Sequence, residues 1–277
     1  MLSVSSVVKM FDYLLIFLVY TPTLLDEMLS FLPRKMIRDN SDRVNDYFSI
    51  SARDLTPPHM CHAAHVLYVP LSLDPEVSRY CASILSDAEL QRADRFASEY
   101  DKALFKQRRA FRRFCGATVL GSSHSLSQVV FEETENGRPY LSDLPDIRFS
   151  FSSCRFGFIG AWSSTHWIGV DIEDQTKSME AAELARCFFS GAEANVVEGV
   201  DGLERLRIFF QFWCIKEAAL KSIGEGMPFG LDAFEFDLAP NPRLVHTPPG
   251  YGRPEQYNTH IIAGTDRCIA LVIRSLA

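Results

Sequence analysis

The sequence predicts an α+β fold, because helical and strand patterns are mixed along the chain without strict alternation. Strand-like runs gather in two groups, and each group has a long amphipathic helical stretch beside it. Two halves of similar size, each with a helix packed on a small, mostly antiparallel sheet, account for this pattern. The two halves share no clear sequence repeat.

The composition places the chain among ordinary globular proteins. It has 277 residues, of which 47% are hydrophobic and 23% are charged. These values exclude a disordered tail, a collagen-like fibre and a small disulfide scaffold. The formal net charge of −7 argues against a nucleic-acid coat, which needs a cationic surface. The seven scattered cysteines form no CxxC pair, so we expect reduced thiols and a cytoplasmic protein.

Residues 1–62 are predicted to be an N-terminal extension or linker, because nothing in them resembles a catalytic motif. Residues 13–20 are apolar and resemble the core of a signal peptide, but no small-residue cleavage site follows. This run is far shorter than the ~20 residues that span a membrane, so no membrane partner is expected. A hydrophobic helix, an export-like segment and a later start, at Met36 or Met60, all stay open.

The rest of the chain is divided into an N-terminal half, residues 63–165, and a C-terminal half, residues 166–277. In the first half, residues 65–71 read as a strand, and Ser86 with Glu89 has the spacing of a helix-starting capping box. The following amphipathic stretch, residues 90–119, forms one helix or two.

The remaining elements follow from turn signals and periodicity. Asn136-Gly137 is a strong hairpin signal between two short strands. Residues 181–189 and 203–222 are predicted helices, and the second has a broad apolar face. The remaining strand-like runs are residues 129–133, 138–141, 147–151, 156–162, 167–173, 234–238 and 260–273.

The most informative segment is Gly-Val-Asp-Ile-Glu at residues 169–173. On a strand, Asp171 and Glu173 point to the same face, because side chains alternate. Two neighbouring carboxylates repel each other, and a hard cation such as Mg²⁺ relieves that repulsion. Taken alone, the segment is better explained by a pair of solvent-facing acids on an edge strand.

A second segment lies within the predicted helix at residues 203–222. Trp213, Glu217 and Lys221 are spaced four residues apart, so they share one helix face. Glu217 together with Asp171 and Glu173 would make a three-carboxylate Mg²⁺ site, and Lys221 would reach a phosphate beyond the metal. The alternative is a surface Glu–Lys pair with Trp213 in the core.

Taken together, GVDIE and the motif FxxWxxKEAxxKxxGxG, at residues 210–226, resemble the phosphopantetheinyl transferases of the surfactin-synthetase-activating (Sfp) type. The resemblance extends through most of residues 65–277. It includes Asn136-Gly137-Arg138-Pro139, Arg186-Cys187-Phe188-Phe189-Ser190, and an early helix with Asp101 and Arg109. The family fold implies two pseudo-symmetric halves, of which the first contacts coenzyme A and the second binds Mg²⁺.

The resemblance implies a reaction. Such enzymes move the 4′-phosphopantetheine arm of coenzyme A onto a serine of an acyl or peptidyl carrier protein and release adenosine 3′,5′-bisphosphate. Mg²⁺ held by Asp171, Glu173 and Glu217 would neutralise the diphosphate, and Lys221 would pair with its oxygens. The catalytic residues would be Glu217 and Lys221. The general base is either Glu217 or a metal-bound hydroxide.

The resemblance also implies a set of coenzyme-binding residues: Arg92, Arg109, Arg138, Pro139, Ser152, Ser153 and Lys221. Guanidinium groups suit the phosphates, although the arginines at residues 108–113 equally fit a solvated helix face. The chain departs from the family at Ser153, where a histidine usually contacts the coenzyme 3′-phosphate. Because serine cannot be cationic, we expect weaker coenzyme affinity but intact chemistry.

The expected protein is therefore a monomer whose partners are carrier proteins of polyketide or nonribosomal peptide synthases, as in antibiotic biosynthesis. The basic residues 108–113 would face an acidic carrier helix. Two rival functions stay open: a coenzyme-A-binding relative that transfers nothing, and a Mg²⁺-dependent pyrophosphohydrolase that uses water in place of serine.

Overall fold

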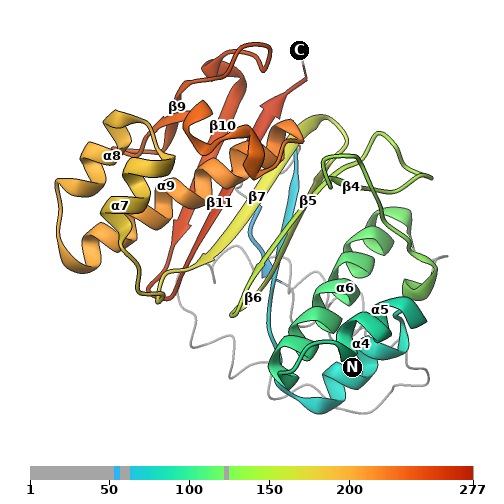
Figure 1. Ribbon diagram of the computed structural model, residues 1–277. Coiled ribbons are helices and arrows are strands. Elements are labelled where there is room, and N and C mark those ends of the chain that lie inside the picture. The colour runs from blue at the N-terminus through green and yellow to red at the C-terminus, as the bar shows by residue number, and fades with distance from the viewer. Residues whose placement is uncertain (1–52, 57–62, 122–124, 277) are drawn as a thin grey trace, which may run out of the picture. The chain divides into compact units, whose positions relative to one another are not determined.

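The computed structural model describes residues 53–56, 63–121 and 125–276, and all of them belong to one compact unit, Asp39–Ala277. Figure 1 shows two groups of helices beside a central set of strands, and the α+β prediction is confirmed. Of the predicted extension at residues 1–62, the structure describes only residues 53–56, and two of them, Arg53 and Asp54, pair with a strand of the N-terminal half. The division at residues 62 and 165 stays a prediction.

The N-terminal half is built on a four-stranded antiparallel sheet in the order β1-β2-β6-β5. Its strands are β1 (Arg53–Asp54), β2 (His65–Pro70), β5 (Arg148–Cys154) and β6 (Gly157–Ser163). The helices of this half are α4 (Pro75–Ser83), α5 (Asp87–Asp94) and α6 (Glu99–Leu120). α6 packs Phe111, Phe114 and Cys115 against Phe149 and Phe158 of the sheet.

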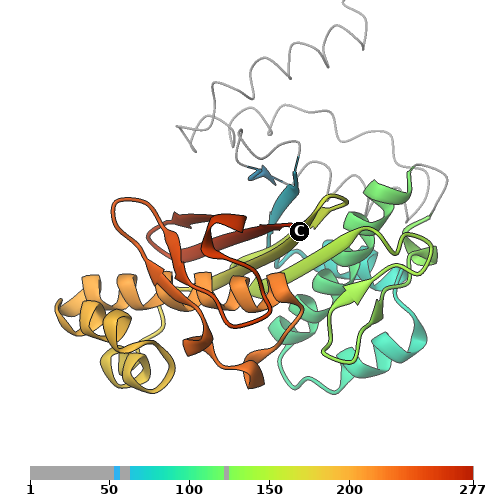
Figure 2. The ribbon, with the colours of Figure 1, turned by 90° about the horizontal axis from the view of Figure 1, so that it is seen from above.

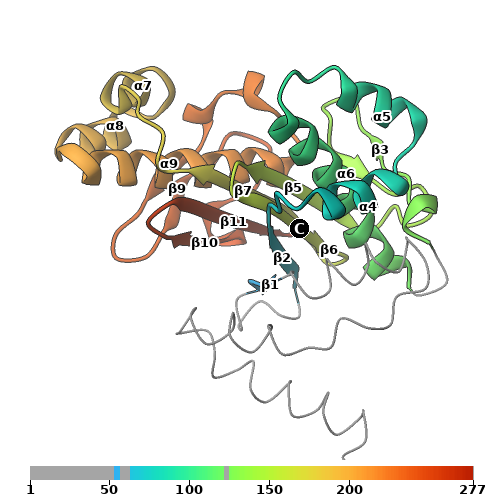
Figure 3. The same ribbon diagram turned by 90° about the horizontal axis from the view of Figure 1, so that it is seen from below.

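The C-terminal half is built on a three-stranded antiparallel sheet in the order β10-β11-β7. Its strands are β7 (His166–Asp174), β10 (Tyr257–Ala263) and β11 (Arg267–Ser275). The helices of this half are α7 (Ala181–Phe188), α8 (Gly191–Glu198) and α9 (Gly202–Ile223). In the view of Figure 3, α9 and α6 lie on the same side of the strands.

Smaller elements connect these layers. Two short antiparallel pairs are formed by β3 (Glu132–Glu133) with β4 (Pro139–Tyr140), and by β8 (Glu235–Asp237) with β9 (Arg243–His246). The 3₁₀ turns are η3 (Leu126–Gln128), η4 (Met227–Phe229), η5 (Leu231–Ala233) and η6 (Pro254–Gln256). The hairpin predicted at Asn136-Gly137 is present as the β3–β4 pair, with Gly137 at a φ of 79°.

The two sheets meet where β5 lies beside β7, and both views from the side and from above show this (Figures 1 and 2). The backbone N–H of Val170 donates to Ser150 Oγ at 3.0 Å. Behind this contact, side chains from both halves share one buried cluster, which includes Val66, Ile159 and Ile172. The shared core fixes β5 of the first half against the GVDIE strand of the second half.

Gly169 explains how closely α9 approaches β7. A Cβ atom at this position would lie 1.8 Å from the carbonyl oxygen of Ala218 and 2.5 Å from the backbone nitrogen of Ser222. Only a residue without a side chain permits that approach. Because Ala218 and Ser222 directly follow Glu217 and Lys221, the contact also sets how far these two side chains stand from β7.

α9 is held from its other side by a fully buried ion pair. Lys216 Nζ lies 2.6 Å from Glu193 Oε2, and the two side chains are 0% and 1% exposed. Lys216 also donates to the carbonyl of Leu231, at 3.0 Å, and to that of Phe234. Glu193 Oε1 accepts a hydrogen bond from the backbone of Phe236 at 2.8 Å. Because the remaining hydrogen-bonding groups of this buried ion pair are also satisfied, the pair holds α8, α9 and β8 together.

The cysteines of the described chain have free thiols, and most of them are buried: Cys81, Cys115, Cys154, Cys187, Cys214 and Cys268, with only Cys187 exposed. The described part of the chain contains no helix that is both long and apolar enough to cross a membrane. The apolar run at residues 13–20 lies outside the described residues.

Candidate functional site

Asp171 lies at the centre of the site, on β7 beside β5. The residue is only 3% exposed, so the alternative of a solvent-facing acid does not hold for it. Asp171 Oδ1 accepts a hydrogen bond from Ser152 Oγ at 2.7 Å and one from Lys221 Nζ at 2.6 Å. Asp171 Oδ2 is buried and has no hydrogen-bond partner. An unpartnered buried carboxylate oxygen is costly, and a ligand that donates or coordinates there would remove the cost.

Glu173 and Glu217 carry charges close enough to Asp171 to disturb their titration. Burial, together with the negative charge of Asp171, raises the pKa of Glu173, although Lys177 Nζ lies 3.5 Å from its Oε2. Burial raises the pKa of Glu217 to about 6, and the charges of Asp171 and Glu173 add to this effect. The three carboxylates therefore repel one another across the β7–α9 contact.

Lys221 supplies the positive charge beside these acids. Burial alone would lower the pKa of its ammonium group, but the ion pair with Asp171 and the charge of Glu217 raise it instead. Trp213, Glu217 and Lys221 are all part-buried, as expected of side chains on one face of α9. Gly224, at a φ of 81°, then ends the helix in the left-handed conformation that glycine favours.

A cavity of about 190 Å³ opens beside Glu217 and Lys221. Its walls come from both halves: Arg112, the 136–139 turn, residues 149–151, and the 224–226 turn. Glu225 closes one side, because its carboxylate accepts from Asn136 Nδ2 at 3.1 Å and from Tyr251 Oη at 3.0 Å. We call this space the carboxylate cavity.

Arg138 and Pro139 line the carboxylate cavity, but the Arg138 guanidinium is already engaged by the protein. It donates to the carbonyls of Lys221 and Ile168 and lies 4.7 Å from the ring centre of Trp167. Burial, with the charges of Arg274 and Arg148, lowers the pKa of Arg138 to about 10. Arg138 therefore holds the end of α9 in place through the Lys221 carbonyl, and it also lines the cavity.

A second cavity, of about 220 Å³, lies next to the first and shares Arg112 and Phe151 with it. Ser152 and Ser153 line it, together with the guanidinium-bearing side chain of Arg108. We call this space the serine cavity. The predicted Ser152 and Ser153 thus lie beside two arginines, Arg108 and Arg112, which the sequence analysis assigned only to the basic stretch facing a carrier.

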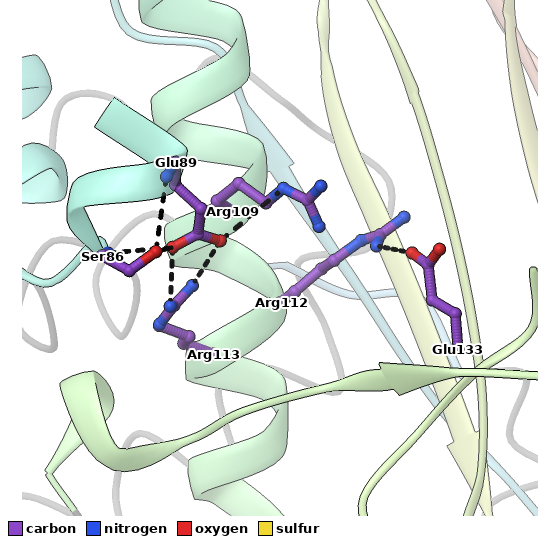
Figure 4. Close-up of polar contacts among 6 residues, drawn as sticks. All are labelled: Ser86, Glu89, Arg109, Arg112, Arg113 and Glu133. Carbon is purple, nitrogen blue, oxygen red and sulfur yellow. Dashed lines mark hydrogen bonds and ion pairs between the residues drawn. The ribbon is translucent and has the colours of Figure 1, made fainter. Parts of the chain in front are cut away.

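Arg92 and Arg109, both predicted to bind the coenzyme, line neither cavity. Arg92 is exposed at the end of α5, and both guanidinium groups lie over Phe105, at 5.8 Å and 5.5 Å from its centre. Figure 4 shows the neighbouring ion pairs. Glu89 Oε2 lies 2.7 Å from Arg113 Nη2, and Glu89 Oε1 lies 3.7 Å from Arg109 Nε.

The basic stretch at residues 108–113 is therefore not a uniform solvated face. Arg113 is buried and donates a hydrogen bond to the Glu89 carboxylate. The same carboxylate accepts a hydrogen bond from the backbone nitrogen of Ser86, the N-cap residue of α5. Arg112 extends from the side of α6 on which Arg109 also leaves the helix (Figure 4). Of the residues predicted to face an acidic carrier helix, Arg113 is thus taken up by an ion pair within the protein.

The predicted metal ligands can be compared with this geometry. Within the described residues, no three or more His, Cys, Asp or Glu side chains are grouped so as to hold a metal ion as they stand. The donor set nevertheless suits Mg²⁺, which prefers carboxylate oxygens. The orphaned Oδ2 of Asp171 and the raised pKa of Glu217 both mark places where a cation would be favourable.

Comparisons with known proteins agree with the motifs. A sequence model described as the 4'-phosphopantetheinyl transferase superfamily matches residues 168–272. The chain is 30% identical over 178 residues to 4'-phosphopantetheinyl transferase Sfp of Bacillus subtilis, covering 62% of this chain and 75% of that protein. It belongs to the 4'-phosphopantetheinyl transferase superfamily.

Other relatives within this superfamily are similarly distant. 4'-Phosphopantetheinyl transferase HetI of Nostoc sp. is 29% identical over 212 residues, covering 75% of this chain and 86% of that protein. A crystal structure of a holo-(acyl-carrier-protein) synthase from Bacillus anthracis in complex with CoA (3',5'-ADP) is 18% identical, with a TM-score of 0.32. It covers 41% of this chain and 99% of that chain, and a likeness this weak supports no conclusion.

The superfamily match begins on β7 and ends on β11, so it contains Asp171, Glu173, Glu217 and Lys221. Arg108 and Arg112 lie outside it, on α6. Their spacing of four residues, on the face of α6 turned toward Phe151, is the signal that could have drawn attention to them.

Proposed function

We propose that this phosphopantetheinyl transferase is of the surfactin-synthetase-activating type and transfers the 4′-phosphopantetheine arm of coenzyme A to a serine of a carrier protein. One observation carries the proposal. A buried carboxylate, Asp171, keeps one oxygen without a partner and is paired with Lys221, which lines a cavity shared by both halves together with Glu217. This is the charge pattern that a diphosphate with a divalent cation would complement.

Asp171, Glu173 and Glu217 would hold Mg²⁺. When bound, the ion would neutralise the charge that builds on the diphosphate as its bridging bond breaks. Asp171 is the best placed of the three, since Ser152 and Lys221 fix its Oδ1 while its Oδ2 stays available. These three residues remain our proposal for the ligand set.

The chain's own side chains supply the rest of the chemistry. The carrier serine Oγ forms a bond to the phosphorus that bears the pantetheine arm, and the bond from that phosphorus to the bridging oxygen breaks. Adenosine 3′,5′-bisphosphate leaves with the bridging oxygen. Glu217, which lines the cavity beside Lys221, accepts the serine proton. The Lys221 ammonium pairs with the phosphate oxygens and offsets their charge.

The remaining predictions follow from the same site. Residues 63–165 would contribute most coenzyme contacts, and residues 166–277 the metal ligands and catalytic groups. Because one chain supplies both sets, a monomer would suffice. The partners would be acyl or peptidyl carrier domains of polyketide or nonribosomal peptide synthases, in the cytoplasm, with no role for nucleic acid or membrane.

The test is to incubate the protein with coenzyme A, MgCl₂ and an apo carrier protein, and to record intact masses. We expect the carrier to gain one phosphopantetheine group and Glu217→Gln to slow that gain strongly, with Glu183→Gln, an exposed acid on α7, as the control. Breakdown of coenzyme A without carrier modification would indicate a pyrophosphohydrolase instead. Coenzyme binding with neither product would indicate a relative that transfers nothing.

A further inference from the structure

The tip of the β5–β6 hairpin lies against the end of β7. Arg155, in the turn between β5 and β6, pairs with Asp174, the last residue of β7, with 2.8 Å between Nε and Oδ2. The hairpin belongs to the sheet of the N-terminal half, and β7 belongs to the sheet of the C-terminal half. The ion pair therefore joins the two halves directly beside Glu173, one of the three proposed metal ligands.

The carboxylate of Asp174 stands at the end of a buried apolar row. Ile168, Val170 and Ile172 precede it on the same face of β7, and they are 0–1% exposed in the cluster that both halves share. The Asp174 side chain is itself only 2% exposed. Replacing a buried ion pair by well-packed apolar side chains is often neutral or stabilising, so stability alone does not account for a carboxylate here.

The contacts of Asp174 shape the turn that follows β7. Asp174 Oδ1 accepts hydrogen bonds from the backbone nitrogen of Thr176 at 2.9 Å and from Thr176 Oγ1 at 2.6 Å. An aspartate that bonds the backbone two residues on in this way fixes a turn. The turn leads to Lys177, whose Nζ lies 3.5 Å from Glu173 Oε2. Asp174 thereby organises the segment that surrounds Glu173.

Arg155 contacts both the carboxylate and the turn. Besides forming the ion pair with Asp174, it donates from Nη2 to Thr176 Oγ1 at 2.5 Å. The backbone carbonyl of Arg155 accepts from Tyr100 Oη at 2.6 Å, which connects the hairpin tip to α6. Because a guanidinium is planar and rigid, two contacts fix its orientation as well as its distance.

The two strands that meet here are joined by side chains. β5 and β7 belong to different sheets, and no backbone hydrogen bond joins the residues of one to those of the other. Ser152, on β5, donates to Asp171 Oδ1 at 2.7 Å. Arg155 makes the corresponding contact at the end of β7, next to Glu173. The placement of the two carboxylates of β7 against the N-terminal half thus depends on these two side chains.

We propose that Arg155 is a positioning residue for the binding of the divalent cation, and that its ion pair with Asp174 fixes the end of β7 that carries Glu173. This inference rests on the proposed function for the set of metal ligands. Arg155 lies outside that set, because a guanidinium has no free electron pair with which to bind a cation. Its effect reaches the ion only through the strand and the turn that Asp174 organises.

A positioning role and a purely electrostatic role predict opposite results for Arg155→Gln. If Arg155 acted only through its charge, its loss would remove a repulsion and tighten the binding of a cation. If Arg155 positions Glu173, its loss weakens that binding, although a positive charge has been removed. We expect the affinity for Mn²⁺ to fall on the order of tenfold, the lower end of the effect of residues that orient metal ligands.

The measurement is a titration with Mn²⁺ followed by electron paramagnetic resonance, with coenzyme A and without a carrier protein. Arg155→Lys keeps a cation that can pair with Asp174, so it should retain most of the affinity that Arg155→Gln loses. Arg243→Gln is the matched control, because Arg243 pairs with Asp237 at 2.7 Å in the β8–β9 pair and not at β7. This control should bind Mn²⁺ as tightly as the wild-type protein does.

Lys177→Gln provides the contrasting case. The Lys177 ammonium faces the Glu173 carboxylate directly and competes with a cation for it, so its removal should tighten Mn²⁺ binding. Loss of Arg155 should have the opposite effect. The Arg155 side chain is 53% exposed, so its substitution leaves no cavity in the core. Thermal unfolding of each variant confirms that the fold is intact.

Unchanged or tighter Mn²⁺ binding by Arg155→Gln would overturn the positioning role. Equal weakening by Arg243→Gln, or no recovery in Arg155→Lys, would overturn it as well. A wild-type protein that binds no Mn²⁺ would refute the role together with the set of metal ligands. The proposed transferase activity is judged separately, by the mass of the carrier protein. A protein that loses Mn²⁺ affinity in Arg155→Gln but modifies no carrier would keep the positioning role and refute the transfer.

Discussion

Replacing Gly169 with alanine tests how the β7–α9 contact positions the site. The added Cβ would lie 1.8 Å from the Ala218 carbonyl oxygen, whereas side-chain carbons essentially never approach closer than 3.0 Å. Because the atoms that block the new Cβ are backbone atoms of α9, no side-chain rotation can relieve the clash. The helix must withdraw from the strand by more than 1 Å, and it must carry Glu217 and Lys221 with it.

The expected magnitudes follow from that displacement. Overpacking of a buried contact costs about 1–3 kcal/mol of stability, and a backbone clash belongs at the upper end of that range or beyond it. A misplacement of catalytic groups by ~1 Å can lower a rate by about 10²-fold. Urea unfolding measures the first effect, and the rate of carrier modification measures the second in the fraction that remains folded.

Gly191→Ala is the matched control for this prediction. Gly191 is the first residue of α8, and a Cβ there would meet no atom within 4 Å. This substitution should be neutral or slightly stabilising, since glycine in a helix costs roughly 0.5–1 kcal/mol relative to alanine. If Gly169→Ala matches Gly191→Ala in both stability and rate, close packing at Gly169 does not position the site.

Three further predictions concern charged groups. Lys216→Met should lower the free energy of unfolding by about 3–5 kcal/mol, measured in urea, because it leaves the Glu193 carboxylate buried without its partner; a loss below ~1 kcal/mol would contradict this. Glu217→Gln should slow carrier modification by about 10²–10⁴-fold at unchanged stability. A rate within roughly threefold of wild type would show that Glu217 takes no part in the chemistry. Glu89 should contribute to stability in a pH-dependent way. Burial alone would raise the pKa of Glu89, but the hydrogen bonds from Arg113 and Ser86 lower it below 4.5. Its contribution should therefore be complete above that value and be lost as the pH falls through the lower folded-state pKa. The stability difference between wild type and Glu89→Gln, measured in urea at several pH values, should shrink on acidification; a difference that stays constant would show that Glu89 is not held as an ion.

The longer elements could be predicted because their patterns are regular. The alternation in GVDIE identified β7, and the broad apolar face of residues 203–222 identified α9. The short helices α4 and α8 were missed, because their stability depends on caps rather than on periodicity. The Ser190 and Glu193 pair forms a capping box, and this was the available signal for α8.

The site was only partly predictable for a different reason. Each motif places its own side chains on a face, but the partners of those side chains come from distant segments. The ion pair of Lys221 with Asp171 depends on the close approach of α9 at Gly169, which no local pattern reveals. The position of Arg112 likewise depends on the packing of α6 against β5, where its guanidinium lies 5.3 Å from the centre of Phe151.

The most direct test of the account is a titration with Mn²⁺, as a paramagnetic substitute for Mg²⁺, followed by electron paramagnetic resonance in the presence of coenzyme A. We expect the wild-type protein to bind one ion per chain. Asp171→Asn and Glu217→Gln should each weaken that binding about tenfold or more, while Glu183→Gln leaves it unchanged. Binding that is absent from the wild-type protein, or equally strong in all three variants, would contradict a divalent-cation site at the junction of β7 and α9.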